Sequence, residues 1–422
     1  MRTFTHYDAA VDKGLNNLYI ISDMGESFRF IHCSDLHLGC RFSGISDADE
    51  RLGKRLRESV FAALDNIVTF AKKEKIDFIV FSGDIFDSTN ETPLTRSRFA
   101  DAIASVKIPC FIIYGNHDTK RKWETSIPLP KNAYVFPEEV THTYYEKDGN
   151  RIAELIGMSF SSVSPDKDFT SDVKKESNLF SIGVFHCNVD GANDDNYAPC
   201  KLSELRKKNI DYWALGHIHK GEMLGRMPYV VYPGNTQGMN PKETGEKGAY
   251  AVTVKDGAVA DISFFKTSAI DWFDITADIT DKTEVNEVLD GIHREVKKGN
   301  ILSVKFTGRG PLDAVLRTGG TESIRKMIES ATGCTVSSID IRTIPEIDLE
   351  ARSENNDFIS AAVNFGKVMS TYDRQRKIDI ICSTTVSQSK RELFESFSDE
   401  ELKQIIDDAT YLVIEKILGA DR

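Results

Sequence analysis

The stretch from Phe28 to Cys40 reads FRFIHCSDLHLGC, and it joins a strand-like run to a pair of polar side chains. Its first six residues, through Cys33, are mostly apolar or aromatic, which predicts a buried β-strand. Asp35 and His37 follow directly, with one leucine between them. A single D-x-H pair often arises by chance, so its meaning depends on how the other strands end.

Four further strand-like runs in the first half also end in polar motifs. The runs are Asp77–Phe81, Cys110–Tyr114, Leu179–Phe185 and Ile210–Leu215. The motifs that close them are Gly83-Asp84-Ile-Phe-Asp87, Gly115-Asn116-His117-Asp118, His186 and Gly216-His217-Ile-His219. In open α/β sheets, ligands bind beyond the carboxyl ends of the strands. We therefore expect the five motifs to meet in one crevice.

Helical patterns separate these strands. Apolar residues recur every three to four positions from Leu52 to Ala71, which predicts an amphipathic helix. Thr92 and Pro93 form a cap and first-turn pair that predicts a second helix, ending near Val106. Strands that alternate with helices predict an α/β fold with a largely parallel sheet. From about residue 229, closely spaced strands joined by a Lys-Asp-Gly turn predict a second sheet packed on the first.

The chain is expected to contain four parts. Residues 28–268 form the principal domain, and residues 1–27 precede it as an extension, interpreted as a disordered leader or a mis-called start. Residues 269–345 alternate strand and helix patterns, which predicts a small α+β cap domain. Residues 346–422 are expected to be helical, and their last helix begins at a capping box from Ser398 to Glu401.

Composition favours a cytoplasmic protein with no membrane partner. The chain has 422 residues and a net charge of −12, and no apolar run approaches the ~20 residues that a membrane helix requires. The N-terminus lacks the basic head and apolar core of a secretory signal. The seven cysteines form no C-x-x-C pair and are interpreted as reduced thiols. The acidic charge argues against binding nucleic acid through global electrostatics.

The strand-end motifs have the residue types of a site for two divalent metal ions. Such a site needs a shared anionic oxygen and a mixed set of oxygen and imidazole donors. Asp84 is the expected bridge, because a carboxylate can bind both ions at once. The other expected ligands are Asp35, His37 and His219 for one ion, and Asn116, His186 and His217 for the other.

Taken together, the motifs FIHCSDLHLG, FSGDIFD, IYGNHD, GHIHK and YPGNTQG…KETGEKG resemble those of the calcineurin-like metallophosphoesterases. Within that superfamily they are similar to the SbcD-like DNA repair exonuclease branch, and to its YhaO-like members in particular. The similarity covers about residues 28–268, and FTGRGPL at 306–312 is similar to the cap domain of that branch. The resemblance implies a four-layer α/β/β/α sandwich.

The resemblance also implies an activity and a set of partners. It implies a manganese-dependent exonuclease that hydrolyses DNA, at double-stranded ends, in repair or recombination. It implies a homodimer and a partner ATPase of the SbcC-type coiled-coil class. In this resemblance His117 faces the scissile phosphate without binding metal, and Asp87 orients it.

Two other functions fit the same residues. An enzyme for small phosphodiesters or nucleotides is favoured by the acidic charge, and a catalytically weak metal-binding subunit of a DNA-end complex is a third interpretation. Basic side chains near the first and third motifs are candidate DNA contacts. The first group consists of Arg51, Lys54, Arg55 and Arg57, and it also fits a solvated helix face. The second group consists of Arg121, Lys122 and Trp123, and it is the preferred one.

Overall fold

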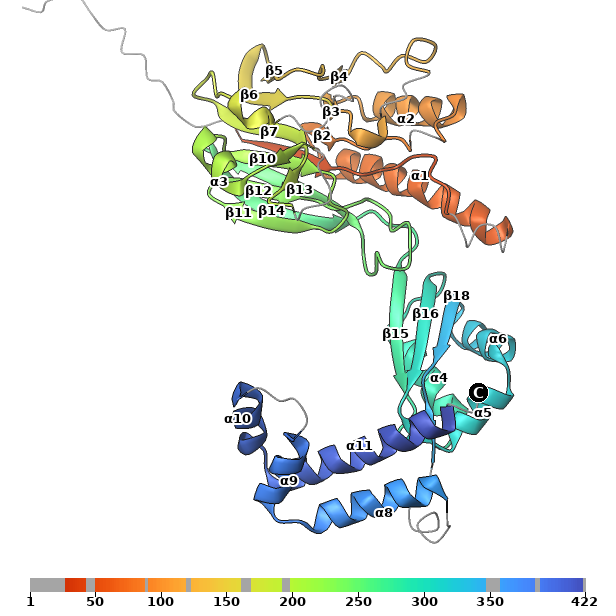
Figure 1. Ribbon diagram of the computed structural model, residues 1–422. Helices are drawn as coiled ribbons and strands as arrows, with labels where there is room; N and C mark the ends of the chain where they lie inside the picture. The colour runs from red at the N-terminus through yellow and green to blue at the C-terminus, as the bar shows by residue number, and fades with distance from the viewer. Residues whose placement is uncertain are drawn as a thin grey trace, which may run out of the picture. The chain divides into compact units, whose positions relative to one another are not determined.

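A computed structural model describes residues 27–42, 50–87, 90–118, 123–160, 168–191, 198–346, 357–383 and 388–419. The expected extension 1–27 therefore lies outside the described residues, apart from Ser27. The chain divides into two compact units, residues 1–272 and 273–422. Figure 1 shows the helices and strands of each.

Two six-stranded sheets form the first unit. In the first sheet four parallel strands are extended by an antiparallel hairpin, in the order β14 (Ala258–Lys266), β13 (Gly248–Lys255), β1 (Phe28–Cys33), β2 (Phe78–Ser82), β3 (Cys110–Ile113) and β4 (Ala133–Val135). In the second sheet four parallel strands lie between antiparallel edges, in the order β11 (Glu222–Arg226), β12 (Tyr229–Tyr232), β10 (Tyr212–Gly216), β7 (Phe180–His186), β6 (Asn150–Gly157) and β5 (Thr141–Lys147).

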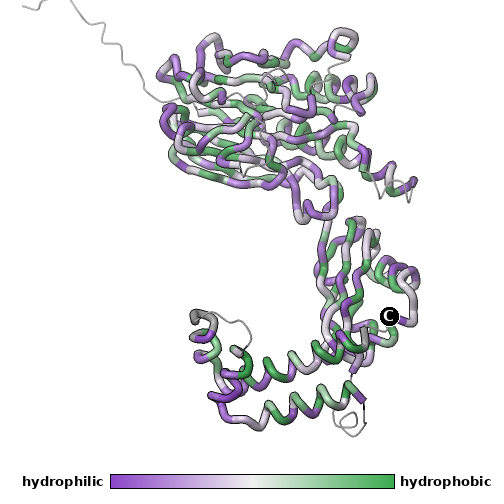
Figure 2. The backbone as a smooth tube through the Cα atoms, in the orientation of Figure 1, coloured by the Kyte–Doolittle hydropathy of each residue, from purple (hydrophilic) through white to green (hydrophobic). Residues whose placement is uncertain are grey.

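The main core fills the space between the two sheets. Phe30 of β1 stacks on Phe78 of β2 with ring centroids 5.2 Å apart, and the ring of Tyr212 from β10 meets Phe30 edge-on at 5.3 Å. All three side chains are buried. Figure 2 shows apolar segments running along the strands of both sheets. Because the central strands of each sheet are parallel, their carboxyl ends lie at one edge of that sheet.

Helices α1 (Glu50–Lys73) and α2 (Pro93–Val106) lie side by side against the first sheet (Figure 1). As the sequence predicts, the Thr92 hydroxyl caps α2 by accepting a hydrogen bond from the Thr95 backbone N–H at 3.1 Å. The outer face of the second sheet carries a smaller helical layer over Phe185 and Trp213. This layer consists of η2 (Phe169–Ser171), α3 (Leu202–Leu205) and η3 (Arg206–Lys208).

The second unit begins with a three-stranded sheet, in the order β15 (Trp272–Asp278), β16 (Ile301–Thr307) and β18 (Thr335–Ile341). Three helices share one apolar core with this sheet: α4 (Val285–Glu295), α5 (Leu312–Thr318) and α6 (Thr321–Thr332). Two short strands, β17 (Arg309–Gly310) and β19 (Ile344–Pro345), pair in parallel.

The remaining described residues are mainly helical and form α8 (Phe358–Thr371), α9 (Arg374–Ile381), α10 (Gln388–Ser396) and α11 (Asp399–Gly419). The predicted capping box is present, because the Ser398 N–H donates to the Glu401 carboxylate and the Glu401 N–H donates to the Ser398 hydroxyl. Leu402 of α11 is buried, whereas Leu412 is about half exposed. Among the described residues, no helix combines the length and the apolar character needed to cross a bilayer.

Candidate metal centre

The five strand-end motifs converge at one edge of the two packed sheets. Asp35 and Asp84 follow β1 and β2, whereas His186 is the last residue of β7 and His217 follows β10 in the other sheet. Asp35, Asp84 and His186 are buried, and one potential ligand atom from each lies within 4.8 Å of the others. Side chains 182 positions apart in the sequence thus meet, as in the contact of His37 with His219.

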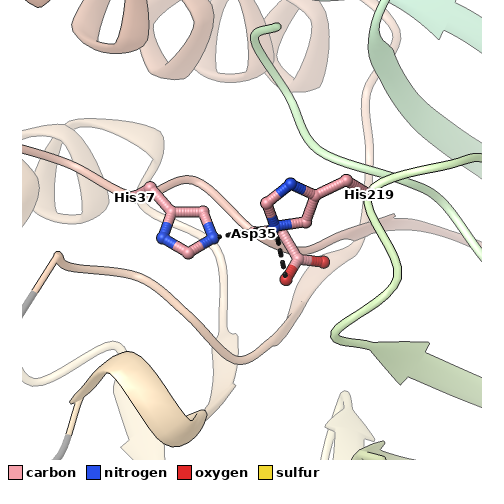
Figure 3. Close-up of side chains that lie close together, drawn as sticks. All are labelled: Asp35, His37 and His219. Carbon is pink, nitrogen blue, oxygen red and sulfur yellow. Dashed lines mark hydrogen bonds and ion pairs between the residues drawn. The ribbon is translucent and has the colours of Figure 1, made fainter. Parts of the chain in front are cut away.

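One part of the cluster consists of Asp35, His37 and His219, which Figure 3 shows with their functional groups pointing toward one another. The Nε2 atoms of His37 and His219 are 3.1 Å apart. The Nε2 atom of His219 lies 3.9 Å from Oδ1 of Asp35. The three donor atoms therefore face a common point.

The other part surrounds Asn116. Its Oδ1 lies 3.0 Å from Nε2 of His186 and 3.3 Å from Nδ1 of His217. The opposite nitrogen of His186, Nδ1, is 2.9 Å from the Ser82 carbonyl oxygen, so a hydrogen bond to that carbonyl leaves Nε2 facing the cluster.

Asp84 lies between the two parts. Its Oδ2 is 3.6 Å from Nε2 of His37 and 3.3 Å from Nε2 of His186. Its Oδ1 accepts a hydrogen bond from the His117 backbone N–H at 2.8 Å. One carboxylate oxygen therefore faces both parts of the cluster, which is the position expected of a bridging ligand.

His117 and Asp87 occupy the rim of the cluster. The His117 side chain is 46% exposed, and its Nδ1 lies 3.7 Å from Oδ1 of Asp87. Asp87 in turn accepts a hydrogen bond from the Asn90 amide at 2.8 Å. Because His117 is more exposed than the histidines below it, a substrate could reach its ring from solvent.

Two glycines permit the close approach of these loops. A Cβ atom on Gly115 would lie 2.2 Å from Oδ1 of Asp84, and one on Gly216 would lie 2.0 Å from the Ser82 carbonyl oxygen. Both distances are far below contact distance, so neither position accepts a side chain without rearrangement. The glycines that precede Asn116 and His217 are thus required by packing.

Two carboxylates that sequence reasoning gave no role support the cluster. Glu243 accepts from Nδ1 of His219 at 2.9 Å, and also from the Met239 N–H and the Asn235 amide. Asp118 accepts backbone N–H groups of Ile85, Phe86 and Gly115, and so ties the second motif to the third. Glu243 lies in the KETG segment, one of the motifs that carry the family resemblance, and this motif could have indicated a role for Glu243 in the site.

Charge in this buried site is strongly coupled. Burial alone would raise the pKa of Asp84, but the neighbouring imidazoles of His186, His37 and His117 together outweigh burial and hold that pKa well below its usual range. Burial would lower the pKa of His186, and the Asp84 carboxylate instead raises it to about 9. Burial, with the charge of Asp84, raises the pKa of Asp118 to about 7.

Comparison with known proteins identifies the domain. Residues 28–221 match the family described as calcineurin-like phosphoesterase. This stretch is a calcineurin-like phosphoesterase domain. Members of this family bind a dinuclear centre of divalent metal ions, and the buried oxygen and imidazole donors around Asp84 fit such a centre. The chain is therefore a hydrolase that acts on phosphoesters.

The chain is also similar to two curated proteins and to one solved structure. It is 29% identical over 399 residues to the uncharacterized metallophosphoesterase YhaO of Bacillus subtilis (strain 168), covering 91% of this chain and 96% of that protein. It is 25% identical over 269 residues to the SbcD component of the nuclease SbcCD from the same organism, covering 54% of this chain and 66% of that protein. It is 14% identical to TT1561 of Thermus thermophilus, with a TM-score of 0.35, covering 57% of this chain and all of that one.

The two groups of candidate DNA contacts differ in how far the structure describes them. Arg51, Lys54, Arg55 and Arg57 are exposed on α1. Arg121 and Lys122 lie outside the described residues, and the indole N–H of Trp123 donates to the Glu91 carbonyl at 3.4 Å.

Proposed function

We propose that this phosphoesterase is a two-metal phosphodiesterase that hydrolyses DNA. The observation that carries the proposal is the position of Asp84, whose Oδ2 faces His37 and His186 from opposite parts of one buried cluster. Asp84 is the proposed bridge between two ions. The remaining proposed ligands form the two sets Asp35, His37 and His219, and Asn116, His186 and His217.

The two ions, when bound, supply Lewis acidity that polarises a phosphate and lowers the pKa of water. His117 is the proposed acid that gives a proton or hydrogen bond to the departing oxygen. Its interaction with Asp87 raises the pKa of His117 above its usual value, although burial acts in the opposite direction. The raised pKa favours the protonated ring. Glu243 orients His219 and stabilises its Nδ1–H tautomer.

DNA is the proposed substrate because one of the relatives is part of a nuclease. By the same reasoning we propose exonuclease action in repair or recombination with manganese, a cytoplasmic site, a homodimer, and a coiled-coil ATPase partner. Catalysis is assigned to residues 28–268, with residues 269–345 as a cap and residues 346–422 as a helical region. The net charge of −12 favours small phosphodiesters as the second candidate.

Substrate comparison separates these two functions. Purified chain with manganese would be assayed on linear duplex DNA and on bis(p-nitrophenyl) phosphate. A DNA nuclease is expected to degrade the duplex from its ends at a kcat/KM well above that for the aryl diester. Cleavage of the aryl diester alone would overturn the assignment to DNA and leave the small-substrate enzyme.

Two variants test the site. D84N is expected to lose metal and activity together, because it removes the proposed bridging charge. H117A is expected to keep two ions per chain, measured by elemental analysis, and to turn over ~10²–10⁴-fold more slowly. His293→Ala, at an exposed position on α4, is the matched control and should match the unmodified chain. Equal loss of metal in D84N and H117A would contradict the division of roles.

A further inference from the structure

A pocket of about 360 Å³ adjoins the proposed catalytic pair. It lies at the junction of α1, the N-terminal end of α2, and the loops that follow β1 and β2, and its walls include Gly39, Arg57 and Asn90. Two of these residues come from the loops of the metal cluster. Gly39 is two positions after His37, and Asn90 donates its amide to Asp87 at 2.8 Å. Asp87 therefore links the pocket residue Asn90 to His117.

The charges that line this pocket do not cancel. Its two carboxylates already have partners: Glu58 pairs with Arg98 at 2.9 Å, and Glu91 pairs with the buried Arg96 at 3.3 Å. Arg41 and Arg57 also line the pocket, and both are exposed. Within the described part of the chain, neither guanidinium has an ion-pair partner.

Arg98, a third arginine of this pocket, is held by its neighbours. The guanidinium of Arg98 lies over the Phe61 ring, 3.6 Å from its centroid, so the Arg98–Glu58 pair is braced against α1. The pocket also faces the first turn of α2 at Thr92 and Leu94, where the helix dipole favours an anion. Leu94 is 69% exposed and offers an apolar surface at the rim.

We infer that this pocket binds the phosphate of the nucleotide next to the scissile bond, through Arg41 and Arg57. Arginine pairs bind phosphate through charge-assisted and often bidentate hydrogen bonds. A second phosphate is present in a polynucleotide and absent from a small monophosphodiester, so the pocket selects nucleic acid substrates. This inference rests on the proposed phosphodiesterase function and adds the feature by which the site recognises a chain of nucleotides. It also explains how an acidic protein can hold an anionic substrate, because the cations are local.

The first test compares substrates that differ by one phosphate. Dithymidylate (TpT) and its 5′- and 3′-phosphorylated forms, pTpT and TpTp, each contain one diester whose cleavage can be followed by chromatography. One of the two phosphorylated forms is expected to have a kcat/KM roughly tenfold or more above that of TpT. In R41Q/R57Q that ratio is expected to fall toward one. The ratio is internal to each protein, so a general loss of activity does not imitate the effect.

The matched control is K72Q/K73Q, which removes the same charge from the last turn of α1. These lysines lie about 24 Å along the helix from Arg57, at 1.5 Å per residue, and they do not line the pocket. K72Q/K73Q should keep the ratio of the unmodified chain. The inference is overturned if neither phosphorylated form gains over TpT, if the gain survives in R41Q/R57Q, or if both double variants lose it equally.

A binding measurement makes the test independent of cleavage. Fluorescein-labelled octathymidylate would be titrated in EDTA at several salt concentrations, with anisotropy as the readout. For single strands the slope of log K against log salt changes by about 0.7 for each phosphate contact, so R41Q/R57Q should have a slope shallower by at least that amount. Equal slopes in R41Q/R57Q and K72Q/K73Q would reject the pocket. Failure of the unmodified chain to cleave TpT, with the slope difference intact, would reject the phosphodiesterase function alone.

Discussion

Glu243 fixes the ring of His219 from a loop 24 positions later in the sequence. A carboxylate behind a metal-binding histidine holds the ring orientation and raises the basicity of the facing nitrogen. Burial would raise the pKa of Glu243, but the hydrogen bond from His219 and those from neighbouring backbone and amide groups lower it to about 2. Glu243 is therefore a charged partner of the proposed ligand at neutral pH.

E243Q is expected to weaken metal binding 10–100-fold, because a neutral amide supports the His219 ring less well. Isothermal titration with manganese would measure the change. E246Q is the matched control, since Glu246 is about half exposed and pairs only loosely with Lys266 at 3.5 Å. Equal metal affinities in the two variants would show that Glu243 does not act on the ligand.

The sequence predicted where the cluster residues lie better than it predicted what supports them. Asp35 and Asp84 follow apolar strands and His186 ends one, so their position at a sheet edge could be inferred from local pattern. Glu243 follows no strand, and its contact with His219 depends on how the loop after β12 folds. No short-range pattern reports such a contact.

At the scale of secondary structure, strand ends in the two sheets are packed so closely that Gly216 admits no side chain. G216A would place a Cβ 2.0 Å from the Ser82 carbonyl of β2. We expect a loss of about 1–3 kcal/mol in the free energy of unfolding, or more if the strands cannot shift. Urea denaturation would measure it.

Gly291 provides the opposite case within a helix. It lies inside α4, and a Cβ there would have no atom within 4 Å. G291A is expected to stabilise the second unit by about 0.5–1 kcal/mol, because alanine loses less backbone entropy in a helix. A stabilising G216A or a destabilising G291A would contradict the packing described here.

The hairpin of β5 and β6 depends on one buried carboxylate. Glu154 on β6 accepts from Nδ1 of His142 on β5 at 2.8 Å, and from the backbone N–H groups of Glu176 and Ser177 at 3.0 Å. Burial would raise the pKa of Glu154, but these hydrogen bonds, with that of the Ser177 hydroxyl, lower it below its ordinary value of 4.5.

Because that pKa is lower in the folded state, the Glu154 carboxylate stabilises the fold above about pH 4.5, and its contribution is lost as the pH falls below that value. E154Q is expected to flatten this acid limb of a plot of melting temperature against pH. E139Q, on the exposed approach to β5, is the control. An acid limb of unchanged steepness in E154Q would refute this role.

Some helices and strands follow from local sequence patterns, and others do not. The strand expected at Cys110–Tyr114 is observed as Cys110–Ile113, because apolar runs report burial directly. The hairpin at 141–157 was not predicted, although Asp148-Gly149 between two strands is a typical hairpin turn. Helix α5 was also not predicted, because it is short and lies between Pro311 and Gly319, and proline and glycine are typical of turns.

For the whole molecule, the division into two units falls inside β15. Trp272 belongs to the first unit, where its indole N–H donates to the Gly238 carbonyl at 2.9 Å and its backbone carbonyl accepts from Gly245. Phe273 begins the second unit and packs on the core of the three-stranded sheet. Two neighbouring residues thus serve different cores.

Substitution of each residue should affect one unit. W272A is expected to destabilise the first unit by about 3–5 kcal/mol, since it removes a buried indole. F273A is expected to act on the second unit. Hydrogen exchange followed by mass spectrometry reports the two units separately, and faster exchange throughout the chain in either variant would contradict the division.

Four residues of the metal cluster have backbone conformations that most amino acids avoid. Asp35, His37, Asp84 and His217 have φ angles of 52°, 45°, 51° and 98°. A left-handed residue other than glycine costs of order 1–3 kcal/mol, and asparagine and aspartate tolerate it best. The residue type at these positions is therefore constrained both by the backbone conformation of the turn and by the donor atom that the side chain supplies. In a library randomised at position 84, survival of heating in chelator should enrich glycine and asparagine, whereas turnover should enrich aspartate alone. The most active sequence and the most stable sequence of the chain are then expected to differ at these same few positions.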